Sequence, residues 1–327
     1  MDTLTTPLIS ILIPTWNRPQ GVISLIERIN SAKNSDLEIV IVDDNSEEKN
    51  WLELKNVASR YKNVRLFRNT HNIGMTNNWN KTIEYAKGTW LGLIHDDDIY
   101  KEGALLRVRS YIDKITAPCL IIQNFNIETP TEALAKGVET VNKMLLPPAS
   151  GQFWHRDITD KLGGFDKRIK YCPDDEFWVR VGFHYPILKV KDFFVISSQH
   201  DKNYMWEIFR RPDFLDQVAL SQKERLKYSL GERYKNPSLL EYYIKDGIWE
   251  TLRTVINNTF LTRQIKIDTF IMYLVKFIKL SFELKRKQRM LKILLRLIAY
   301  KFYQPIKPFV MKLKLFISNK RLSKSTK

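Results

Sequence analysis

Three consecutive aspartates, Asp96 to Asp98, directly follow the apolar run Trp90–Ile94. Carboxylates two positions apart at a strand end or turn present hard oxygen atoms toward one point, and such oxygens suit Mg²⁺ or Mn²⁺. No cluster of histidines or cysteines competes for an ion, since His95 is the only such residue beside them, so the aspartates are the expected ligands. The competing interpretation is a solvated acidic turn that caps a helix over Tyr100–Leu106. The triplet by itself leaves both interpretations open.

Two further acidic clusters contain carboxylates suited to ligand binding or catalysis. Asp43 and Asp44 end the apolar run Leu37–Val42, where a carboxylate accepts a hydrogen bond from a nucleobase N–H or a ribose hydroxyl. An N-cap or Asx turn that opens the next helix is the alternative. Asp174 and Asp175 open an amphipathic helical pattern. One carboxylate near a hydroxyl serves as a general base, whereas acids also simply favour the positive end of a helix.

The elements that must position these clusters alternate along the first half of the chain. Strands are expected at Leu8–Pro14, Leu37–Val42, Val64–Phe67, Trp90–Ile94, Cys119–Gln123 and Ile187–Ser197. Helices are expected at Pro19–Ala32, at Met75–Lys87 and at Asp174–Phe183, and a further helix follows the polar stretch DDNSEE and ends near Tyr61. Residues 126–150 are expected to be a weakly patterned loop. Short buried strands followed by helices predict an α/β fold, with a mostly parallel sheet covered on both faces. Ligands of such folds bind beyond the carboxyl ends of the strands, where the acidic clusters fall.

We expect a catalytic domain at 1–212 and a helical region at 213–327, because strand signals largely vanish past Pro212 and helical patterns take over. From Gln264 onward, 17 Lys and Arg stand against two acids, a net charge of +15, while the preceding residues carry +2. The two cysteines, Cys119 and Cys172, make no disulfide framework and suit a reducing compartment. We expect neither a secretory leader nor a transmembrane helix, since no uncharged apolar run reaches about 18 residues.

The stretch Leu284–Phe302 sorts on a helical wheel into an apolar side and a basic side. A basic amphipathic helix of this kind favours docking on an anionic membrane surface. The alternatives are a helical subdomain with a solvated basic face and a nucleic-acid-binding segment. No recognised nucleic-acid-binding motif accompanies the charge, so we expect no nucleic-acid partner.

Taken in order, the stretches ISILIPTWNRP, EIVIVDDNSEE, NIGMTNNWNKTIEYAKGTWLGLIHDDDIY and GGFDKRIKYCPDDEFWVRV resemble the family 2 glycosyltransferases with the GT-A fold. The resemblance covers residues 7–200. It implies a Rossmann-like GT-A domain that transfers a sugar from a nucleotide diphosphate sugar, most often a UDP-sugar, with inversion. It also implies an acceptor hydroxyl on a glycan or a lipid-linked molecule in cell-surface polysaccharide biosynthesis. The non-enzymatic alternative is a catalytically inactive sugar-nucleotide-binding or scaffold protein on a membrane.

The resemblance further implies a role for each motif residue. Asp44 would bind the base, and the whole set around the nucleotide sugar is Thr15, Asn17, Arg18, Asp43, Asp44, Asn72, Gly74, Asn80, Asp96 and Asp97. The residues implied at a Mn²⁺ or Mg²⁺ ion are Asp96, Asp97, Asp98 and His200. Asp174 is implied as the general base, with Asp175 as the alternative because Pro173 stands where the family often has Glu.

Three expectations concern the surroundings of the site. Trp154, in SGQFWHRDI, packs either against an acceptor sugar ring or in the core. Cys172 is expected to be a small packing residue next to the base. The basic tail, together with the resemblance, implies a cytoplasmic enzyme that is peripherally bound to the inner face of the cytoplasmic membrane.

Overall fold

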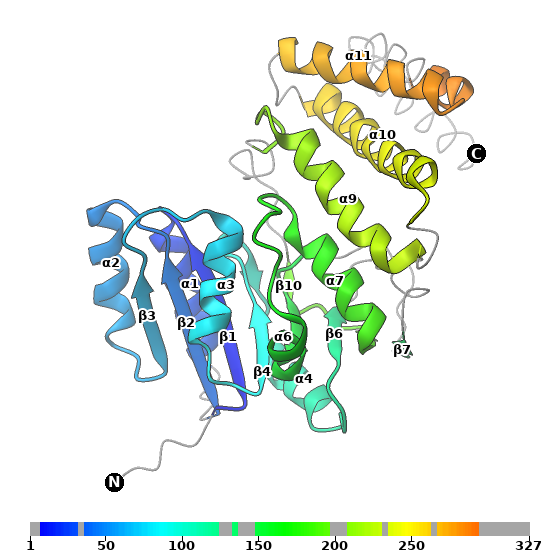
Figure 1. Cartoon of the computed structure of the whole chain (residues 1–327). Coiled ribbons are helices and arrows are strands. Elements are labelled where there is room, and N and C mark those ends of the chain that lie inside the picture. The colour runs from blue at the N-terminus through cyan, green and yellow to red at the C-terminus, as the bar shows by residue number, and fades with distance from the viewer. Residues whose placement is uncertain are drawn as a thin grey trace, which may run out of the picture. The chain divides into compact units, whose positions relative to one another are not determined.

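The computed structural model describes residues 7–31, 36–123, 133–136, 148–196, 208–230, 235–262 and 267–293. Within these ranges the first part of the chain forms an eight-stranded sheet of order β3-β2-β1-β4-β8-β6-β9-β7 (Figure 1). Its strands are β1 (Ile9–Thr15), β2 (Leu37–Asp43), β3 (Val64–Arg68), β4 (Trp90–Leu93), β6 (Leu120–Gln123), β7 (Ala133–Lys136), β8 (Gln152–His155) and β9 (Pro186–Val190). A separate ribbon pairs β5 (Ile99–Tyr100) with β10 (Val195–Ile196).

The strand directions confirm the mostly parallel sheet. β1 pairs in parallel with both β2 and β4, and β3 continues in parallel from β2. β8 is antiparallel to β4 and β6, and β7 is antiparallel to β9. The sequence did not predict β8, because four residues without polar and apolar alternation are too short a signal. The position of β8 between β4 and β6 makes it the centre of the sheet nonetheless.

The single strand expected over Ile187–Ser197 is wrong, because β9 and β10 lie in different sheets. Between them the chain turns away from the main sheet. The side-chain amide of Gln123 then replaces a neighbouring strand. Its oxygen accepts from the backbone N–H groups of Phe194 (2.7 Å) and Val195 (3.0 Å), and its nitrogen donates to the Val195 carbonyl. A buried glutamine on β6 thus ends the strand at a point that hydrophobic pattern alone does not mark.

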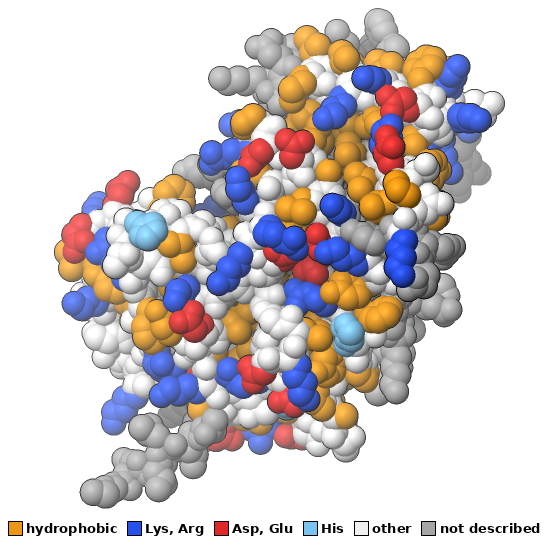
Figure 2. Space-filling view, in the orientation of Figure 1, with side chains coloured by type: hydrophobic (Ala, Val, Ile, Leu, Met, Phe, Trp, Pro, Cys, Tyr) orange, Lys and Arg blue, Asp and Glu red, His pale blue; other side chains and the backbone are white. Residues whose placement is uncertain are grey.

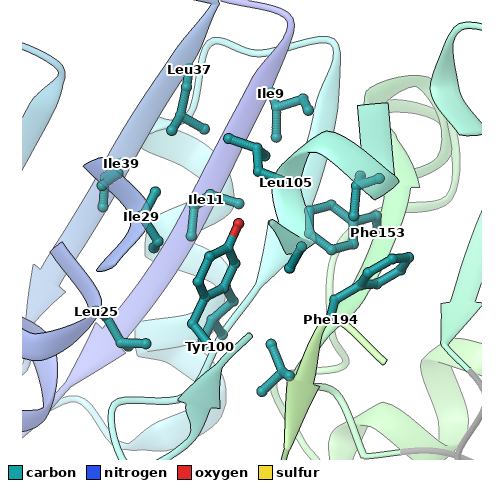
Figure 3. Packing of buried hydrophobic residues seen from close by; sticks show 14 of the residues in the cluster. Ile9, Ile11, Leu25, Ile29, Leu37, Ile39, Tyr100, Leu105, Phe153 and Phe194 are labelled. Carbon is teal, nitrogen blue, oxygen red and sulfur yellow. The ribbon is translucent and has the colours of Figure 1, made fainter. Parts of the chain in front are cut away.

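Helices cover both faces of the sheet, as expected. They are α1 (Pro19–Asn30), α2 (Glu48–Ala58), α3 (Met75–Tyr85), α4 (Ala104–Ile112), α6 (Arg156–Leu162) and α7 (Pro173–His184). Because side chains alternate along a strand, Ile9 and Ile11 of β1 point to one face, where they pack with Leu25 and Leu105 (Figure 3). Leu12 points to the opposite face and belongs to a second core cluster.

The chain forms two compact units. The first comprises Met1–Asn203 and Asp213–Leu240, and the second comprises Tyr204–Pro212 and Glu241–Lys327. Helix α9 (Phe214–Leu230) belongs to the first unit and packs on α7. The second unit contains most of α10 (Pro237–Thr262) and all of α11 (Ile267–Glu283), which confirms a helical C-terminal region. Inside it the Trp249 indole donates to Ser281 Oγ at 2.7 Å and stacks on Phe277. Among the described helices, none is long and apolar enough to cross a membrane.

Candidate active site

The acidic clusters meet at one edge of the sheet. Thr15 at the end of β1 is in register with Asp43 at the end of β2, and the aspartate triplet follows β4, the other neighbour of β1. Parallel strands end at the same edge, so the loops after them form one surface. The alternative that the triplet caps a helix over Tyr100–Leu106 is wrong, since Tyr100 lies in β5 and α4 begins only at Ala104.

A positive group does lie among the carboxylates, and it is Arg18. Its Nη1 donates to Asp97 Oδ2 at 2.6 Å and lies 3.3 Å from Asp96 Oδ1. Thr15 Oγ1 donates to the other oxygen of Asp96 at 2.7 Å. Burial raises the pKa of Asp96, and the Arg18 charge and the Thr15 hydrogen bond offset this only in part. Asp96 therefore connects the loop after β4 to the loop after β1.

The candidate ion ligands differ from the predicted set. Among the described residues, His95, Asp97 and Asp98 each offer one ligand atom, all within 4.8 Å of one another. His95 Nδ1 lies 3.8 Å from Asp98 Oδ2, and its Nε2 is buried without a hydrogen bond in the described part of the chain. The two carboxylates suit Mn²⁺ or Mg²⁺, whereas an imidazole ligand does not suit the hard Mg²⁺ ion. The sequence assigned His95 no ligand role, and the predicted ligand His200 lies outside the described residues.

Trp79 holds the histidine in place. The Trp79 and His95 rings lie 5.0 Å apart at 31°, with Trp79 on α3 and His95 just beyond β4. Asp96 is not in the candidate ion group, and its two oxygens contact Thr15 and Arg18. No short motif in the sequence links His95 to Trp79. Spatial proximity alone identifies the pair.

Asp43 closes a turn, as in the Asx-turn alternative, but it does not cap α2, whose N-cap residue is Glu47. Its carboxylate accepts from the Ser46 backbone N–H at 3.0 Å and from the Ser46 hydroxyl, and it forms an ion pair with Arg68 Nε at 3.5 Å. Burial raises the pKa of Asp43, although the Ser46 hydrogen bonds and Arg68 act in the other direction. This carboxylate fixes the turn that follows β2.

Asp44 organises the segment before α3. One oxygen accepts from Asn69 Nδ2 and from the Ile73 backbone N–H, both at 2.9 Å, and the other accepts from the Gly74 N–H at 3.0 Å. Asn72 Oδ1 also accepts from the Gly74 N–H, at 3.1 Å. Gly74 has φ 84°, a conformation that glycine adopts without a Cβ penalty. Asp44, Asn72 and Gly74 therefore lie together, as the resemblance implies.

Asn17 ties the loop after β1 to the loop after β2. Its backbone N–H donates to Ser46 Oγ at 2.7 Å, and its side-chain oxygen accepts from the Glu47 N–H at 2.8 Å. Asn17 has φ 55°, a left-handed conformation in which Asn is enriched. The preceding residue, Trp16, is 51 % exposed at this edge. Sequence reasoning passed over Trp16, although an exposed indole between two site residues offers a stacking surface for a base.

Asn80 lies on α3 and contacts the backbone of Phe165. Its Nδ2 donates to the Phe165 carbonyl and its Oδ1 accepts from the Phe165 N–H, both at 2.9 Å. A donor contact through these atoms would require both bonds to break. Asn80 thus fixes the Gly163–Asp166 loop that precedes the candidate base.

We expect Asn80→Ala to destabilise the protein without abolishing nucleotide binding. The change leaves two backbone groups of Phe165 without their partner, and each such loss costs about 1–3 kcal/mol. The thermal midpoint should fall by several degrees, while UDP affinity measured by calorimetry below that midpoint stays within about threefold. A large loss of UDP affinity in a folded Asn80→Ala protein would return Asn80 to the donor site.

Asp174 opens α7 and has the properties of a general base. Cys172, with φ 51°, turns the chain into the helix, and Asp174 Oδ2 accepts from the Ala149 N–H at 3.0 Å. Burial raises the pKa of Asp174 to about 7, and the neighbouring Asp175 charge adds to the shift. Burial also raises the pKa of Asp175, but its side chain is 39 % exposed and lies 3.7 Å from Arg225 Nη1, whose charge acts in the other direction. A carboxylate with a pKa near neutral pH suits proton transfer, so Asp174 is the better candidate.

The segment 149–151 connects the base to the ion group. The His95 N–H donates to Ser150 Oγ at 3.1 Å, and the Gly151 N–H donates to the Leu93 carbonyl at 2.8 Å. Ala149 reaches Asp174, as described above. Three successive small residues thus contact both chemical groups. Ser150 and Gly151 begin the stretch SGQFWHRDI, for which the sequence suggested an acceptor-side position of Trp154 and no contact with either chemical group.

Trp154 and Cys172 are structural. Trp154 is fully buried on β8 and packs edge-on against Phe165, Phe177 and Trp178, so the interpretation as an acceptor-sugar platform is wrong. Burial raises the pKa of the Cys172 thiol, with the Asp174 charge acting in the same direction. A thiol that resists ionisation is a poor nucleophile, in keeping with a packing role.

Known proteins share this sequence pattern. The chain is 26 % identical over 237 residues to the GalNAc(5)-diNAcBac-PP-undecaprenol beta-1,3-glucosyltransferase of Campylobacter jejuni, covering 69 % of this chain and 72 % of that protein. It is 31 % identical over 187 residues to an uncharacterized glycosyltransferase of Haemophilus influenzae, covering 53 % of this chain and 62 % of that one.

Solved structures share the fold. TarS 1–349 of S. aureus in complex with UDP-GlcNAc superposes with a TM-score of 0.61 at 16 % identity, covering 83 % of this chain and 81 % of that one. The mannosyltransferase PcManGT of Pyrobaculum calidifontis, in complex with GDP-Man and Mn²⁺, gives a TM-score of 0.54 at 13 % identity, covering 92 % and 88 %. The model of the Glycosyl transferase family 2 matches residues 10–173, half of the chain. This protein therefore belongs to glycosyl transferase family 2 and is a glycosyltransferase with the GT-A fold.

Proposed function

We propose that this enzyme transfers a sugar from a UDP-sugar to a hydroxyl group of a glycan or lipid-linked acceptor, with inversion at the anomeric carbon. The observation that carries the proposal is the 149–151 segment, which contacts both a carboxylate with a pKa near 7 and the backbone of the candidate ion group. A base beside a site for the diphosphate is what a single displacement needs. It does not need a nucleophilic side chain.

In the proposed step the acceptor oxygen bonds to the anomeric carbon while the bond from that carbon to the diphosphate oxygen breaks. Asp174 takes the acceptor proton. Residues His95, Asp97 and Asp98 would hold Mn²⁺, which when bound stabilises negative charge on the leaving diphosphate. Arg18, which pairs with Asp97 and Asp96, would add a positive charge beside the diphosphate.

The substrates are inferred from chemistry and from relatives. A uracil base would stack on the exposed Trp16 ring near Asp44, and the UDP-GlcNAc complex of TarS supports a UDP-sugar donor. The Campylobacter relative is named for a glycan linked to PP-undecaprenol, which supports a lipid-linked acceptor here. With the tail charge of +15 from Gln264 onward, this acceptor suggests cell-surface polysaccharide synthesis at the inner face of the cytoplasmic membrane.

A donor screen with product analysis tests the proposal. Thermal shift with Mn²⁺ across UDP-, GDP- and dTDP-sugars should give its largest stabilisation with a UDP-sugar, because only binding to the folded state raises the midpoint. NMR of the product formed with that donor should show the opposite anomeric configuration to the donor. Retention of configuration would exclude the single displacement, and a preference for GDP-sugars would exclude the proposed donor.

A further inference from the structure

Helix α11 is apolar on two opposite sides, and within the described part of the chain only one of them is covered. Its inner side buries Tyr273, Phe277 and Leu280 within the second unit. Its outer face, defined here as Ile271, Met272, Val275 and Phe282, exposes between 50 % and 61 % of each residue. An exposed and contiguous apolar face on a helix marks an interaction surface.

Basic side chains border this outer face. Lys276 and Lys279 are exposed on the same side of α11, and neither forms an ion pair within the described part of the chain. Lys287 Nζ lies 4.7 Å from the centroid of the Phe282 ring. Hydrophobic and basic side chains accordingly lie next to each other over α11 (Figure 2). The acid at the end of the helix, Glu283, is paired with Lys245 at 3.0 Å.

The charge of this border argues against two other occupants. Residues 294–327 contain nine Lys and Arg and no acid, so they would repel the outer face electrostatically. A second copy of the chain would bring the same lysines against themselves. Both occupants would have to cover an apolar face while burying like charges, which is costly. The fitting partner is apolar at its centre and anionic at its rim.

We infer that the outer face of α11 docks on an anionic lipid surface. Its apolar side chains would enter the boundary between headgroups and acyl chains, while Lys276 and Lys279 extend their charged ends to lipid phosphates. This inference rests on the proposed membrane location. It adds the contact surface on α11, whereas the sequence predicted docking through the basic stretch Leu284–Phe302, with Phe270–Phe282 as a further apolar stretch.

Vesicle co-sedimentation of the full-length chain tests the inference. Val275→Glu should lower binding to phosphatidylglycerol-containing vesicles about tenfold or more, since it places a negative charge at the centre of the face. Leu106→Glu on α4 is the matched control, because Leu106 and Val275 are both 61 % exposed and gain the same charge. It should change binding less than twofold. Transfer to a soluble acceptor should be equal in both variants.

The outcomes separate this inference from the proposed function. Wild-type binding by Val275→Glu, with binding lost on deletion of residues 294–327, would overturn the α11 surface and leave the membrane location intact. No vesicle binding by the wild-type chain would overturn both. Equal losses in Val275→Glu and Leu106→Glu would show an unspecific charge effect and also overturn the inference. Stronger wild-type binding to phosphatidylglycerol than to pure phosphatidylcholine vesicles is the supporting result for the lysine border.

Discussion

Replacing Asp174 with Asn is expected to reduce kcat by about 10²–10⁴-fold, the usual contribution of a positioned general base. The asparagine oxygen can still accept from the Ala149 N–H, so the start of α7 and the 149–151 segment should keep their positions. UDP affinity, measured by calorimetry, should therefore change little. Full activity in Asp174→Asn would remove this residue from the role, and activity lost only in Asp175→Asn would transfer the role to its neighbour.

The raised pKa of Asp174 leads to two further expected results, one in the pH dependence of kcat and one in thermal stability. The base works when ionised, so wild-type kcat should rise with pH through about 7 and level off above it. Ionisation of a buried carboxyl with a raised pKa opposes folding, and this cost grows from the unfolded-state pKa of 3.8 up to about 7. Asp174→Asn removes that cost, so the inactive variant should melt at a higher temperature than the wild type at neutral pH.

The second large effect is expected at Asp98. The side chain is 3 % exposed and faces His95, and Asp98→Asn removes one anionic ligand from the candidate ion group. Mn²⁺ affinity, measured by electron paramagnetic resonance without donor, should fall at least about 100-fold, with a comparable loss of transfer. His95→Gln should lower the affinity about tenfold, because it removes a neutral ligand and leaves both carboxylates.

Asp96→Asn is the informative control for that result. The structure gives the Asp96 oxygens to Thr15 and Arg18, so this variant should lose stability before it loses ion affinity. The sequence motif instead places Asp96 at the ion together with Asp98. A larger loss of Mn²⁺ affinity in Asp96→Asn than in Asp98→Asn would show that the motif, and not the observed contacts, identifies the ligands.

Local patterns carried the prediction of the α/β architecture. Apolar β-branched runs located β1, β2 and β4 within one or two residues, and Pro19 marked the start of α1 correctly. Short strands with mixed residues escaped, β8 above all. The break between β9 and β10 also escaped, because it depends on Gln123, which is 71 residues from Phe194 in sequence.

The sequence likewise predicts some features of the candidate site and misses others. The sequence shows that acidic residues follow the strands, but it does not show which oxygen each one engages. Arg18 and Asp97 are 79 residues apart, and Asn80 and Phe165 are 85 residues apart. Pairs of this kind depend on the tertiary fold, so no rule based on sequence spacing predicts them. His95 escaped for the same reason, since a single histidine reads as a ligand only when its neighbours are known.

The position of Arg18 has a consequence for how this protein matures. A structural zinc domain without its metal leaves ligands that repel one another, and it stays unfolded until the ion arrives. Here the guanidinium of Arg18 lies 2.6 Å from Asp97 and 3.3 Å from Asp96, and so supplies a counter-charge from the chain itself. The newly made polypeptide can assemble this edge of the sheet in a cell depleted of divalent ions. Under the proposed metal-assisted mechanism, ion supply would govern when the enzyme works, and not whether it folds.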